Sequence, residues 1–488
     1  MLDPGFLEGS TWGAPGARVE HVETHAAHVF LVGDRAYKIK KSVKYPYLDF
    51  STVGKREAVL ARELEINRIF APEIYLHVMH ARGEPVLVMR RFRGEDLLAE
   101  RLKREPLSPD LARSLARAIA DAHRLAPQRD VAGSRVMRGL VNQLTQAFAT
   151  SPDIFDGADA REFSDRAGAH LARLAALLDL RTSKGLVRRC HGDLHAGNIV
   201  VVGDRPMLFD CIEFSEEIAT IDVLYDLAFL LMDLVHCGER HGANRVFNHY
   251  LNLRRREEDL SGLAAMPLFL AIRAGVRALV TADRMHTAES GGQDKAREEA
   301  RSFLANCLTE LQPLPPRLIC VGGFSGSGKS TLADALAPST GSLPGAVLVR
   351  SDVERKILAG VAETEKLPFD SYTPQSSRRV YDTALARAAQ ALKAGHAVIL
   401  DAVFSRAEER AAAERLAADM GVAFTGLWLE ATPAQMKARV AQRHHDASDA
   451  DIGVIEKQMS FDTGKVSWHR VDAGGTPAEV LSRARILI

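Results

Sequence analysis

The chain has 488 residues, of which 46% are hydrophobic and 26% are charged. This composition is typical of a globular protein rather than a disordered one, and the length predicts about three folding units, best divided into two domains of which one has two lobes. The 63 Lys and Arg residues balance the 63 Asp and Glu residues, which excludes an overall basic field for holding nucleic acid or an anionic membrane.

No targeting segment is expected, because the opening residues lack both a basic stretch and an apolar one. The two most apolar stretches, 223–235 and 266–280, are each interrupted by charged residues, and neither approaches the roughly 20 uncharged residues of a membrane span. The five cysteines are scattered and form no Cys-x-x-Cys pair, which indicates reduced thiols rather than disulfides or a zinc site. We therefore expect a cytoplasmic protein with no membrane partner.

The first predicted domain covers residues 1–311, with a small lobe at about 19–92 and a mostly helical large lobe at about 93–311. Apolar spacing in the small lobe predicts strands at 28–32, 36–40 and 85–90 and a helix over 56–70. An extended segment at 186–210 interrupts the large lobe. A proline-rich linker at 312–316 ends the domain, because prolines at this density cannot continue a helix.

The second predicted domain covers residues 317–488, where strands and helices alternate. Strands are predicted at 318–322, 346–350, 397–401 and 424–430. Two helices begin at Thr432 and Thr476, each followed by a proline and, three residues on, by Gln or Glu. This alternation is typical of a parallel α/β sheet.

The first domain contains a loop with the residue spacing of a kinase catalytic loop. Residues 191–198 read HGDLHAGN, and Asp210 follows the next hairpin. The spacing His-x-Asp-x-x-x-x-Asn is that of the protein-kinase catalytic loop. Asp193 would accept the proton of an acceptor hydroxyl, while Asn198 and Asp210 would hold Mg²⁺ from opposite sides.

On these residues, the segment 19–311 resembles the aminoglycoside phosphotransferase/choline kinase-like family, which has a bilobal protein-kinase-like fold. The resemblance implies ATP as phosphate donor and a strand lysine that holds its α- and β-phosphates. Lys38 and Lys40 both fit and share one face of the strand, and Lys38 is favoured because it directly follows the apolar run. Glu57 and Glu63 compete as its carboxylate partner, and Glu63 is favoured.

Further residues of this domain agree with the family only in part. Asp222 and Asp226 match a segment that braces the catalytic loop, and we interpret both as structural. No glycine-rich phosphate loop precedes the lysine strand, where residues 23–28 stand instead. A site for an antibiotic acceptor would need acidic residues, and the candidates are Glu213, Glu216 and Glu217. A charged loop of this kind is usually just solvated.

The second domain carries a phosphate-binding loop. Residues 323–330 read GFSGSGKS, which fits G-x-x-x-x-G-K-[ST] between an apolar strand and a helix. The glycines let backbone N–H groups converge on phosphate oxygens, with Lys329 reaching the β- and γ-phosphates and Ser330 holding Mg²⁺. The expected nucleotide contacts are Gly323, Ser325, Gly326, Ser327, Gly328, Lys329, Ser330 and Thr331.

Charged residues follow the strands of this domain. Asp352 and Asp401 come at the ends of two strands, where parallel sheets bind ligands. Asp352 would accept the proton of the acceptor hydroxyl, Arg355 would steady a phosphate or substrate anion, and Asp401 would be a partner of Mg²⁺. Arg439 and Arg443 lie four apart on one helix face and would lean over the triphosphate as a lid.

On these motifs, residues 317–488 look like the P-loop small-molecule and polynucleotide kinases, a group that includes gluconate kinase-like, chloramphenicol phosphotransferase-like and zeta-toxin-like proteins. The resemblance implies transfer of the γ-phosphate to a hydroxyl. A motor ATPase is not favoured, because Ala402 rather than a glutamate follows Asp401.

The sequence therefore predicts a mixed fold, α+β in the N-terminal kinase-like domain and three-layer α/β in the P-loop domain. It predicts two kinase modules that use ATP and Mg²⁺ to phosphorylate a hydroxyl of a small molecule such as a sugar or related metabolite. Three alternatives stay open: one module as a nucleotide-binding regulator of the other, a C-terminal 5′-hydroxyl nucleic-acid kinase, or an antibiotic phosphotransferase. The acceptor, the oligomeric state and the choice between ATP and GTP are open as well.

Overall fold

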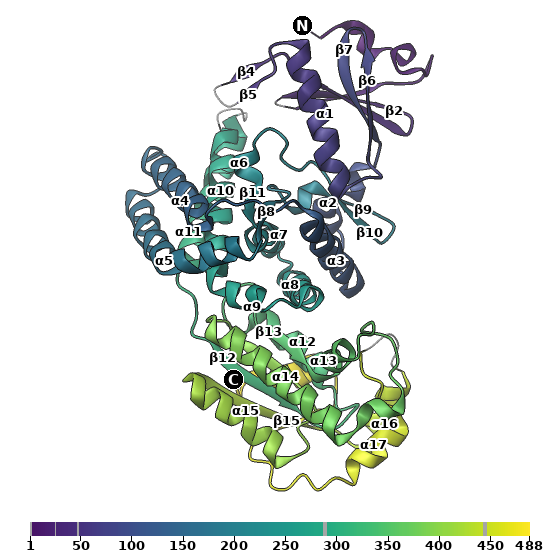
Figure 1. Ribbon diagram of the computed structural model, residues 1–488, viewed down its shortest axis with the longest axis vertical. Coiled ribbons are helices and arrows are strands. Elements are labelled where there is room, and N and C mark those ends of the chain that lie inside the picture. The colour runs from purple at the N-terminus through teal and green to yellow at the C-terminus, as the bar shows by residue number, and fades with distance from the viewer. Residues whose placement is uncertain (1, 25, 46–47, 286–289, 443–446) are drawn as a thin grey trace. The chain divides into compact units, whose positions relative to one another are not determined.

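The computed structural model describes residues 2–24, 26–45, 48–285, 290–442 and 447–488 (Figure 1). The chain forms two compact units. The first comprises Met1–Ser151, Leu171–Arg254 and Ile272–Leu279, and the second comprises Pro152–His170, Arg255–Ala271 and Val280–Ile488. Helices α5 (Gly157–Ser183) and α10 (Met266–Met285) contribute residues to both units, so the units are not divided at one point of the chain. The boundaries at 311 and 317 and the linker between them stay a prediction.

The first unit contains a five-stranded antiparallel sheet with strand order β1-β2-β3-β7-β6. Its strands are β1 (Glu20–Glu23), β2 (Ala27–Val32), β3 (Arg35–Lys40), β6 (Tyr75–Ala81) and β7 (Glu84–Arg90), and α1 (Val53–Phe70) packs against β6 and β7. The three predicted strands and the predicted helix are confirmed as β2, β3, β7 and α1. The sequence missed β1, whose residues are all exposed and give no apolar alternation.

Two short 3-10 turns, η1 (Pro4–Leu7) and η2 (Gly9–Trp12), pack onto this sheet. The ring of Trp12 stacks on those of Tyr37 and Phe30, with centroids 4.4 and 5.3 Å apart, and its Nε1 donates to the carbonyl of Phe6 at 3.0 Å. No periodic pattern indicates this contact in the sequence, because Phe6 and Trp12 lie in two separate short turns rather than in one helix or strand.

The extended segment of the large lobe contains three short strands. They are β8 (Val187–Arg189), β9 (Ile199–Val202) and β10 (Arg205–Leu208); β9 and β10 form a hairpin, and β8 pairs with β11 (Thr220–Asp222). Residues 191–198 therefore run from β8 into β9, and Asp210 follows β10, as the sequence predicts. The remaining elements of the first unit are β4 (Lys44–Tyr45), β5 (Leu48–Asp49), α2 (Leu98–Leu102), α3 (Pro109–Leu125), α4 (Gly133–Ala149), α6 (Glu216–Ala219), α7 (Val223–His236) and α8 (Arg240–Arg254).

The second unit contains a five-stranded parallel sheet with strand order β13-β14-β12-β15-β16. Its strands are β12 (Arg317–Gly322), β13 (Val347–Arg350), β14 (Val398–Asp401), β15 (Ala423–Glu430) and β16 (His469–Asp472). The four predicted strands are confirmed. The sequence missed β16, a four-residue strand in which only Val471 is buried.

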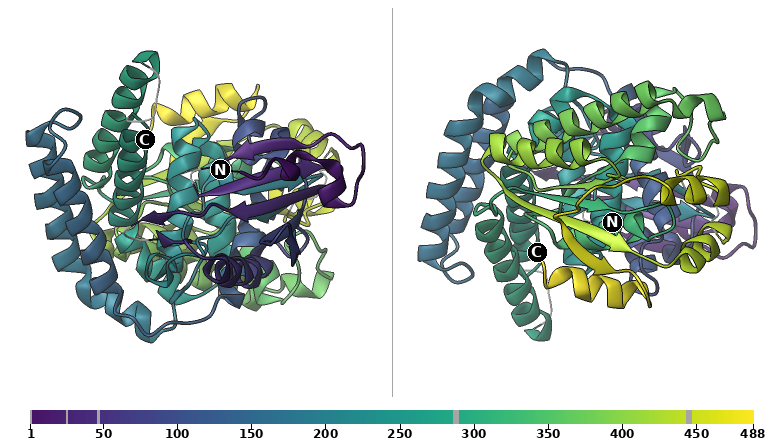
Figure 2. Two further views of the ribbon diagram at one scale, coloured as in Figure 1. Left: turned by 90° about the horizontal axis from the view of Figure 1, so that it is seen from above. Right: turned by 90° about the horizontal axis from the view of Figure 1, so that it is seen from below.

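Helices cover both faces of this sheet, which confirms the predicted three-layer α/β fold. Figure 2 shows the sheet between the green helices α14 and α15 on one face and the yellow C-terminal helix α18 on the other. The helices of this unit are α9 (Glu257–Gly262), α11 (Ser290–Glu310), α12 (Lys329–Leu336), α13 (Ser351–Leu358), α14 (Pro374–Lys393), α15 (Ala407–Met420), α16 (Pro433–Ala441), α17 (Ile452–Met459) and α18 (Pro477–Arg485).

The two predicted helix starts are confirmed. Thr432 and Thr476 are the N-caps of α16 and α18, and their hydroxyls accept from the backbone N–H of Gln435 and Glu479 at 3.3 Å. In both cases the Gln or Glu side chain bonds back to the threonine N–H, which completes a capping box.

One helical stretch, Glu257–Asp283, is long and apolar enough by composition to cross a membrane. Most of it is buried inside the protein, including 72% of its most apolar window. Arg273 in this stretch donates to the carbonyls of Tyr225 and Gly192 at 3.1 and 3.0 Å. These contacts are those of a helix in a protein core.

A buried ion pair fixes the start of α7. Asp222 caps this helix by accepting from the N–H of Leu224 at 2.8 Å, and its two oxygens accept from Arg181 Nε and Nη2 at 2.6 and 2.7 Å. Both side chains are almost fully buried. Removing one partner of such a pair leaves an uncompensated charge.

We predict that Asp222→Ala lowers the free energy of local unfolding of α7 by about 3–5 kcal/mol. Hydrogen exchange of the α7 amides in the full chain measures this change. Asp121→Ala is the control, because it breaks an exposed pair with Arg124 and should change the free energy by less than about 1 kcal/mol. Equal effects of the two substitutions would contradict the structural role of the buried pair.

Candidate functional site

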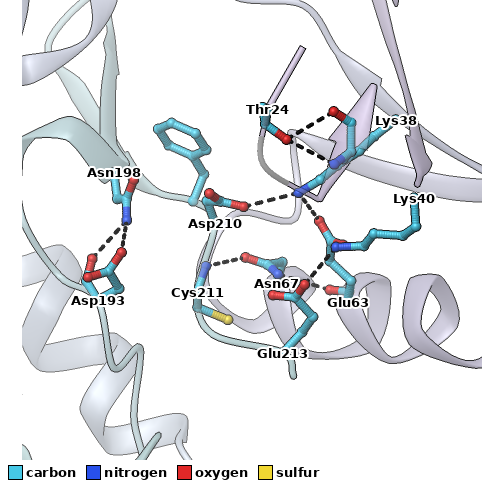
Figure 3. Close-up of polar contacts among 12 residues, drawn as sticks. Thr24, Lys38, Lys40, Glu63, Asn67, Asp193, Asn198, Asp210, Cys211 and Glu213 are labelled. Atoms are coloured by element: carbon cyan, nitrogen blue, oxygen red, sulfur yellow. Dashed lines mark hydrogen bonds and ion pairs between the residues drawn. The ribbon is translucent and has the colours of Figure 1, made fainter. Parts of the chain in front are cut away.

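Two lysines of β3 share one buried glutamate of α1 (Figure 3). Lys38 Nζ lies 2.7 Å from Glu63 Oε1, and Lys40 Nζ lies 2.8 Å from Glu63 Oε2. Lys38 also contacts Asp210 Oδ1 at 3.2 Å, and Lys40 contacts Glu213 Oε1 at 2.7 Å. The two lysines project to the same side of the strand, as their spacing predicts.

These contacts determine which groups are charged. Burial alone would raise the pKa of Glu63, but the charges of Lys38 and Lys40 hold it well below its usual range. Burial would likewise lower the pKa of Lys38, yet the carboxylates of Asp210 and Glu63 raise it well above its usual value. The competing Glu57 is exposed and lies 3.3 Å from His80 Nε2 instead. The structure therefore pairs Lys38 with Glu63.

Backbone N–H groups of the loop 191–198 donate hydrogen bonds to carboxylates of α7. Asp226 accepts from the N–H groups of His191 and Gly192 at 3.1 and 2.9 Å, and Asp233 accepts from the N–H of Ala196 at 2.9 Å. Both carboxylates are buried, so these are strong, charge-assisted bonds. Asp226 thus has a bracing contact of the kind that the sequence predicts for it.

Asp193 stands at the tip of this loop, next to Asn198. Asn198 Nδ2 donates to the Asp193 carboxylate and to its carbonyl, both at 2.9 Å (Figure 3). Burial alone would raise the pKa of Asp193, but the nearby imidazole of His195 lowers it to about 2, so the carboxylate is ionised at neutral pH. Because the amide nitrogen of Asn198 is engaged, its amide oxygen is the atom that can bind a cation.

A pocket of about 370 Å³ joins these groups. Lys38, Asp193 and Asp210 all line it, so it combines a cation for phosphate oxygens with carboxylate oxygens of the kind that Mg²⁺ prefers. Thr24 and Ala27 also line it, and Thr24 Oγ1 exchanges hydrogen bonds with the N–H and carbonyl of Ala27 at 3.0 Å. Both residues belong to the sequence segment 23–28, which stands in place of a glycine-rich loop.

Two of the three acidic residues considered for an antibiotic acceptor are paired with cations. Glu213 contacts the second lysine of β3, as described above. Glu216 lies 2.6 Å from Arg62 and 3.2 Å from Arg189. Partial burial would raise the pKa of Glu216, but these two arginines lower it to about 2. The third, Glu217, is exposed.

The phosphate loop of the second unit borders a pocket of about 390 Å³. Its conformation depends on glycine: Gly326 and Gly328 have φ values of +80° and +98°. A Cβ atom on Gly326 would lie 2.6 Å from the carbonyl of Met436, so a larger residue would push the loop away from α16. This geometry accounts for Gly328, a fixed position of the motif, and for Gly326, which the motif leaves open.

Every predicted nucleotide contact from Ser325 to Thr331 lines this pocket, whereas Gly323 is not among its lining residues. Gly323, the first residue of the loop, packs closely against β15, because a Cβ atom there would lie 2.7 Å from the carbonyl of Leu429. The buried Ser327 hydroxyl has no hydrogen-bond partner among the described residues. The loop therefore offers a free polar group and a helix N-terminus, which suit a phosphate.

Ser330, Asp401 and Asp352 come together at this pocket. Ser330 Oγ donates to Asp401 Oδ2 at 2.6 Å, and Arg350 Nε lies 3.4 Å from the same carboxylate oxygen. Asp352 lines the pocket, and its pKa is raised, first by burial and then by the negative charge of Asp401. The oxygens of Ser330 and Asp401 are of the type that suits Mg²⁺.

Arg439 of α16 is near the phosphate loop, as the sequence predicts. It lines the pocket, and its guanidinium donates to the carbonyls of Ser327 and Ala473 at 3.1 and 2.7 Å. Its predicted companion, Arg443, lies outside the described residues.

Arg355 is not among the residues that line the P-loop pocket, and its role in steadying a phosphate or substrate anion stays a prediction. Its guanidinium donates to the carbonyl of Ser371 at 3.2 Å and lies over the ring of Tyr372, 4.8 Å from its centroid. One helical turn does separate it from Asp352, but the long side chain turns toward the start of α14.

Sequence reasoning missed residues that reach the two sites from distant segments. Gln458 Oε1 of α17 accepts from the N–H of Ser325 at 2.7 Å, and Tyr75 Oη accepts from the N–H of Asp210 at 3.0 Å. Ser448 lines the P-loop pocket. None of these residues belongs to a recognisable motif, so no sequence signal was available to find them.

Two family models match the chain. One, described as the Phosphotransferase enzyme family, matches residues 48–260, and the other, described as an AAA domain, matches residues 318–462. The first contains Glu63, Asp193 and Asp210, and the second contains the phosphate loop. Both belong to kinase families, which confirms that the chain is an enzyme of the phosphotransferase class.

The chain is also similar to solved structures. A choline/ethanolamine kinase family protein from Mesorhizobium loti is 18% identical with a TM-score of 0.40, covering 61% of this chain and 92% of that one. A gluconokinase from Sinorhizobium meliloti 1021 is 20% identical with a TM-score of 0.25, covering 36% of this chain and 95% of that one.

A relative covers nearly the whole chain. It is an uncharacterized protein of Mycobacterium tuberculosis (strain ATCC 25618 / H37Rv), 32% identical over 471 residues, which are 93% of this chain and 92% of that protein. In this chain, a segment of the Phosphotransferase enzyme family precedes an AAA domain of the P-loop kinase type. The chain therefore belongs to the family of this mycobacterial protein.

Proposed function

We propose that the chain carries two ATP-dependent kinase modules, each transferring the γ-phosphate to a hydroxyl of a small molecule such as a sugar or related metabolite. The main support is that two pockets, of about 370 and 390 Å³, each combine a lysine for phosphate oxygens, oxygen atoms for Mg²⁺ and a carboxylate for the acceptor. The five free thiols fit a reducing compartment, and we place the protein in the cytoplasm.

In the first module, Lys38 would bind the α- and β-phosphates while Glu63 keeps its ammonium in place. Asn198 and Asp210 would hold Mg²⁺, which when bound neutralises charge on the phosphates. The ionised Asp193 would orient the acceptor hydroxyl and accept its proton.

In the second module, the backbone N–H groups of the phosphate loop and Lys329 would bind the β- and γ-phosphates. Ser330 and Asp401 would hold Mg²⁺. Asp352 would accept the hydroxyl proton, and its raised pKa makes the ionised carboxylate a stronger base than an ordinary aspartate.

The structure favours some acceptors over others. A polycationic antibiotic is disfavoured at the first site, because Glu213 and Glu216 are already paired with cations. A nucleic acid is disfavoured at the second, because the chain has 63 basic and 63 acidic residues and no overall positive charge. Neither argument applies to a small neutral or anionic compound with a hydroxyl group.

An acceptor screen with labelled γ-phosphate in the full chain tests the proposal. The acceptors are sugars, nucleosides, aminoglycosides and oligonucleotides. We expect Asp193→Asn to lower transfer to one group of acceptors by about 100-fold or more and Asp352→Asn to do the same for the acceptors of the other module. Asp204→Asn, in the exposed turn between β9 and β10, is the control and should leave both unchanged.

Each other outcome of this screen has a defined meaning. If both substitutions leave transfer to every acceptor intact, the proposal is wrong. If only one of them matters while both pockets bind nucleotide, one module is a regulator of the other. Salt-sensitive transfer to oligonucleotides would assign the P-loop module to nucleic acid.

The two proposed bases should titrate at different pH. The pKa of Asp193 is lowered to about 2, and that of Asp352 is raised. A base works only when ionised, so a falling pH should stop Asp352-dependent transfer first. We predict that the acid limb of kcat/KM in the Asp193→Asn chain lies at higher pH than that in the Asp352→Asn chain.

Both profiles use the same MgATP, so titration of its phosphates affects them alike. The comparison therefore isolates the two carboxylates. An acid limb at higher pH for the Asp193-dependent activity would contradict the environments described here.

A further inference from the structure

The helix that carries Asp352 is held on its opposite side by a separate ion cluster. Asp352 lies in the first turn of α13 and lines the P-loop pocket. Glu354 follows two residues later, which on a helix is about 200° around the axis, so the two side chains leave opposite sides. The Glu354 side chain is almost fully buried, at 1% exposed.

Two arginines neutralise Glu354. Arg255 Nη1 and Nη2 donate to Oε1 and Oε2 at 2.8 and 2.5 Å, and Arg387 Nε of α14 lies 3.1 Å from Oε1. The two parallel bonds from Arg255 fix the orientation of the carboxylate as well as its distance. All three residues belong to the second compact unit.

Arg255 is the unexpected member of this cluster. It lies in the segment that the Phosphotransferase enzyme family matches, whereas Glu354 and Arg387 lie in the segment matched by the AAA domain. Its φ is +52°, a left-handed conformation that is uncommon for a residue other than glycine. Such a conformation persists only where surrounding contacts hold it, and the paired bonds to Glu354 are contacts of this kind.

The helix itself is too short to set its own direction. With eight residues, α13 has little stability in isolation, so its rotation depends on side-chain contacts. Beyond Asp352 it is tied through Glu354 to Arg255, and through the buried Lys356 to both carboxylate oxygens of Asp449 at 2.6 Å.

We propose that Arg255 is a positioning residue for the P-loop site: by holding Glu354 it fixes the rotation of α13 and so the direction in which Asp352 presents its carboxylate. The inference rests on the proposed role of Asp352 as the base. Arg255 is not among the residues that line the P-loop pocket. The activity of this site then depends on a residue from outside its own family segment.

Arg255 is also the informative position to change. Without it, Glu354 still has Arg387 as a counter-charge, so the unit should fold. Removing Glu354 would instead leave two arginines without their carboxylate, which is far more destabilising.

The test uses the full chain with the first module silenced by Lys38→Met and Asp193→Asn. The probe is MgATP with water as acceptor, and the relevant rate is the part of ATP turnover that Asp352→Asn removes. We expect Arg255→Met to lower this rate about tenfold, since small misplacement of a catalytic group costs that much or more. The affinity for a non-hydrolysable MgATP analogue should change less than about twofold, because the phosphate loop is untouched.

Two further variants and one further measurement complete the design. Arg255→Lys keeps the charge but not the two parallel bonds, and should recover part of the rate. Arg256→Met is the matched control, because Arg256 pairs with Glu258 of its own segment, and it should change nothing. Hydrogen exchange of the α13 amides should rise in Arg255→Met and stay unchanged in Arg256→Met.

The outcomes are distinguishable. If Asp352→Asn itself leaves turnover and transfer intact, the proposed function of this site fails first. If Asp352→Asn lowers ATP turnover but Arg255→Met has the same turnover rate as Arg256→Met, the inference is wrong. This holds even if the α13 amides of Arg255→Met exchange hydrogen faster. A loss of nucleotide affinity in Arg255→Met that equals its loss of rate also contradicts the inference. If Arg255→Met does not fold, the same criteria are applied to Arg255→Lys.

Discussion

The pairing of Lys38 with Glu63 is the contact on which the first site depends. A lysine that binds phosphate must keep its charge and its place when no phosphate is present, and in a buried setting both require a carboxylate. Glu63 provides it, and its second oxygen holds Lys40, which in turn reaches Glu213 beyond Asp210. One glutamate thus links the lysine strand to the segment that carries a proposed magnesium ligand.

The two proposed bases lie in different electrostatic environments. Asp193 lies beside the imidazole of His195, which lowers its pKa, whereas the pKa of Asp352 is raised by burial and then by the carboxylate of Asp401. A cation bound by Asp401 would remove part of the cause of that shift. The surroundings of Asp193 thus favour its ionised form, whereas those of Asp352 disfavour that form, and a bound cation would weaken this effect.

How far the sequence predicted these sites depends on how local their determinants are. The phosphate loop and the HGDLHAGN loop are contiguous, so their residue types and spacing reveal them. The carboxylate partner of Lys38 could be narrowed to Glu57 and Glu63 because a strand and the helix after it were both predicted. The structure pairs Lys38 with Glu63, the favoured one. The contacts of Trp12, Gln458 and Arg255 join segments far apart in the chain and follow no period or motif, so packing alone determines them. The contacts of Arg355 with Ser371 and Tyr372 likewise follow no sequence pattern.

The central claim is that one chain binds two nucleotides in two separate pockets. Isothermal titration of the full chain with a non-hydrolysable MgATP analogue measures this directly. The account predicts two sites per chain, reduced to one by Lys38→Met, to one by Lys329→Ala, and to none by both together. A single site that either substitution alone abolishes, or one site that survives both, would contradict it.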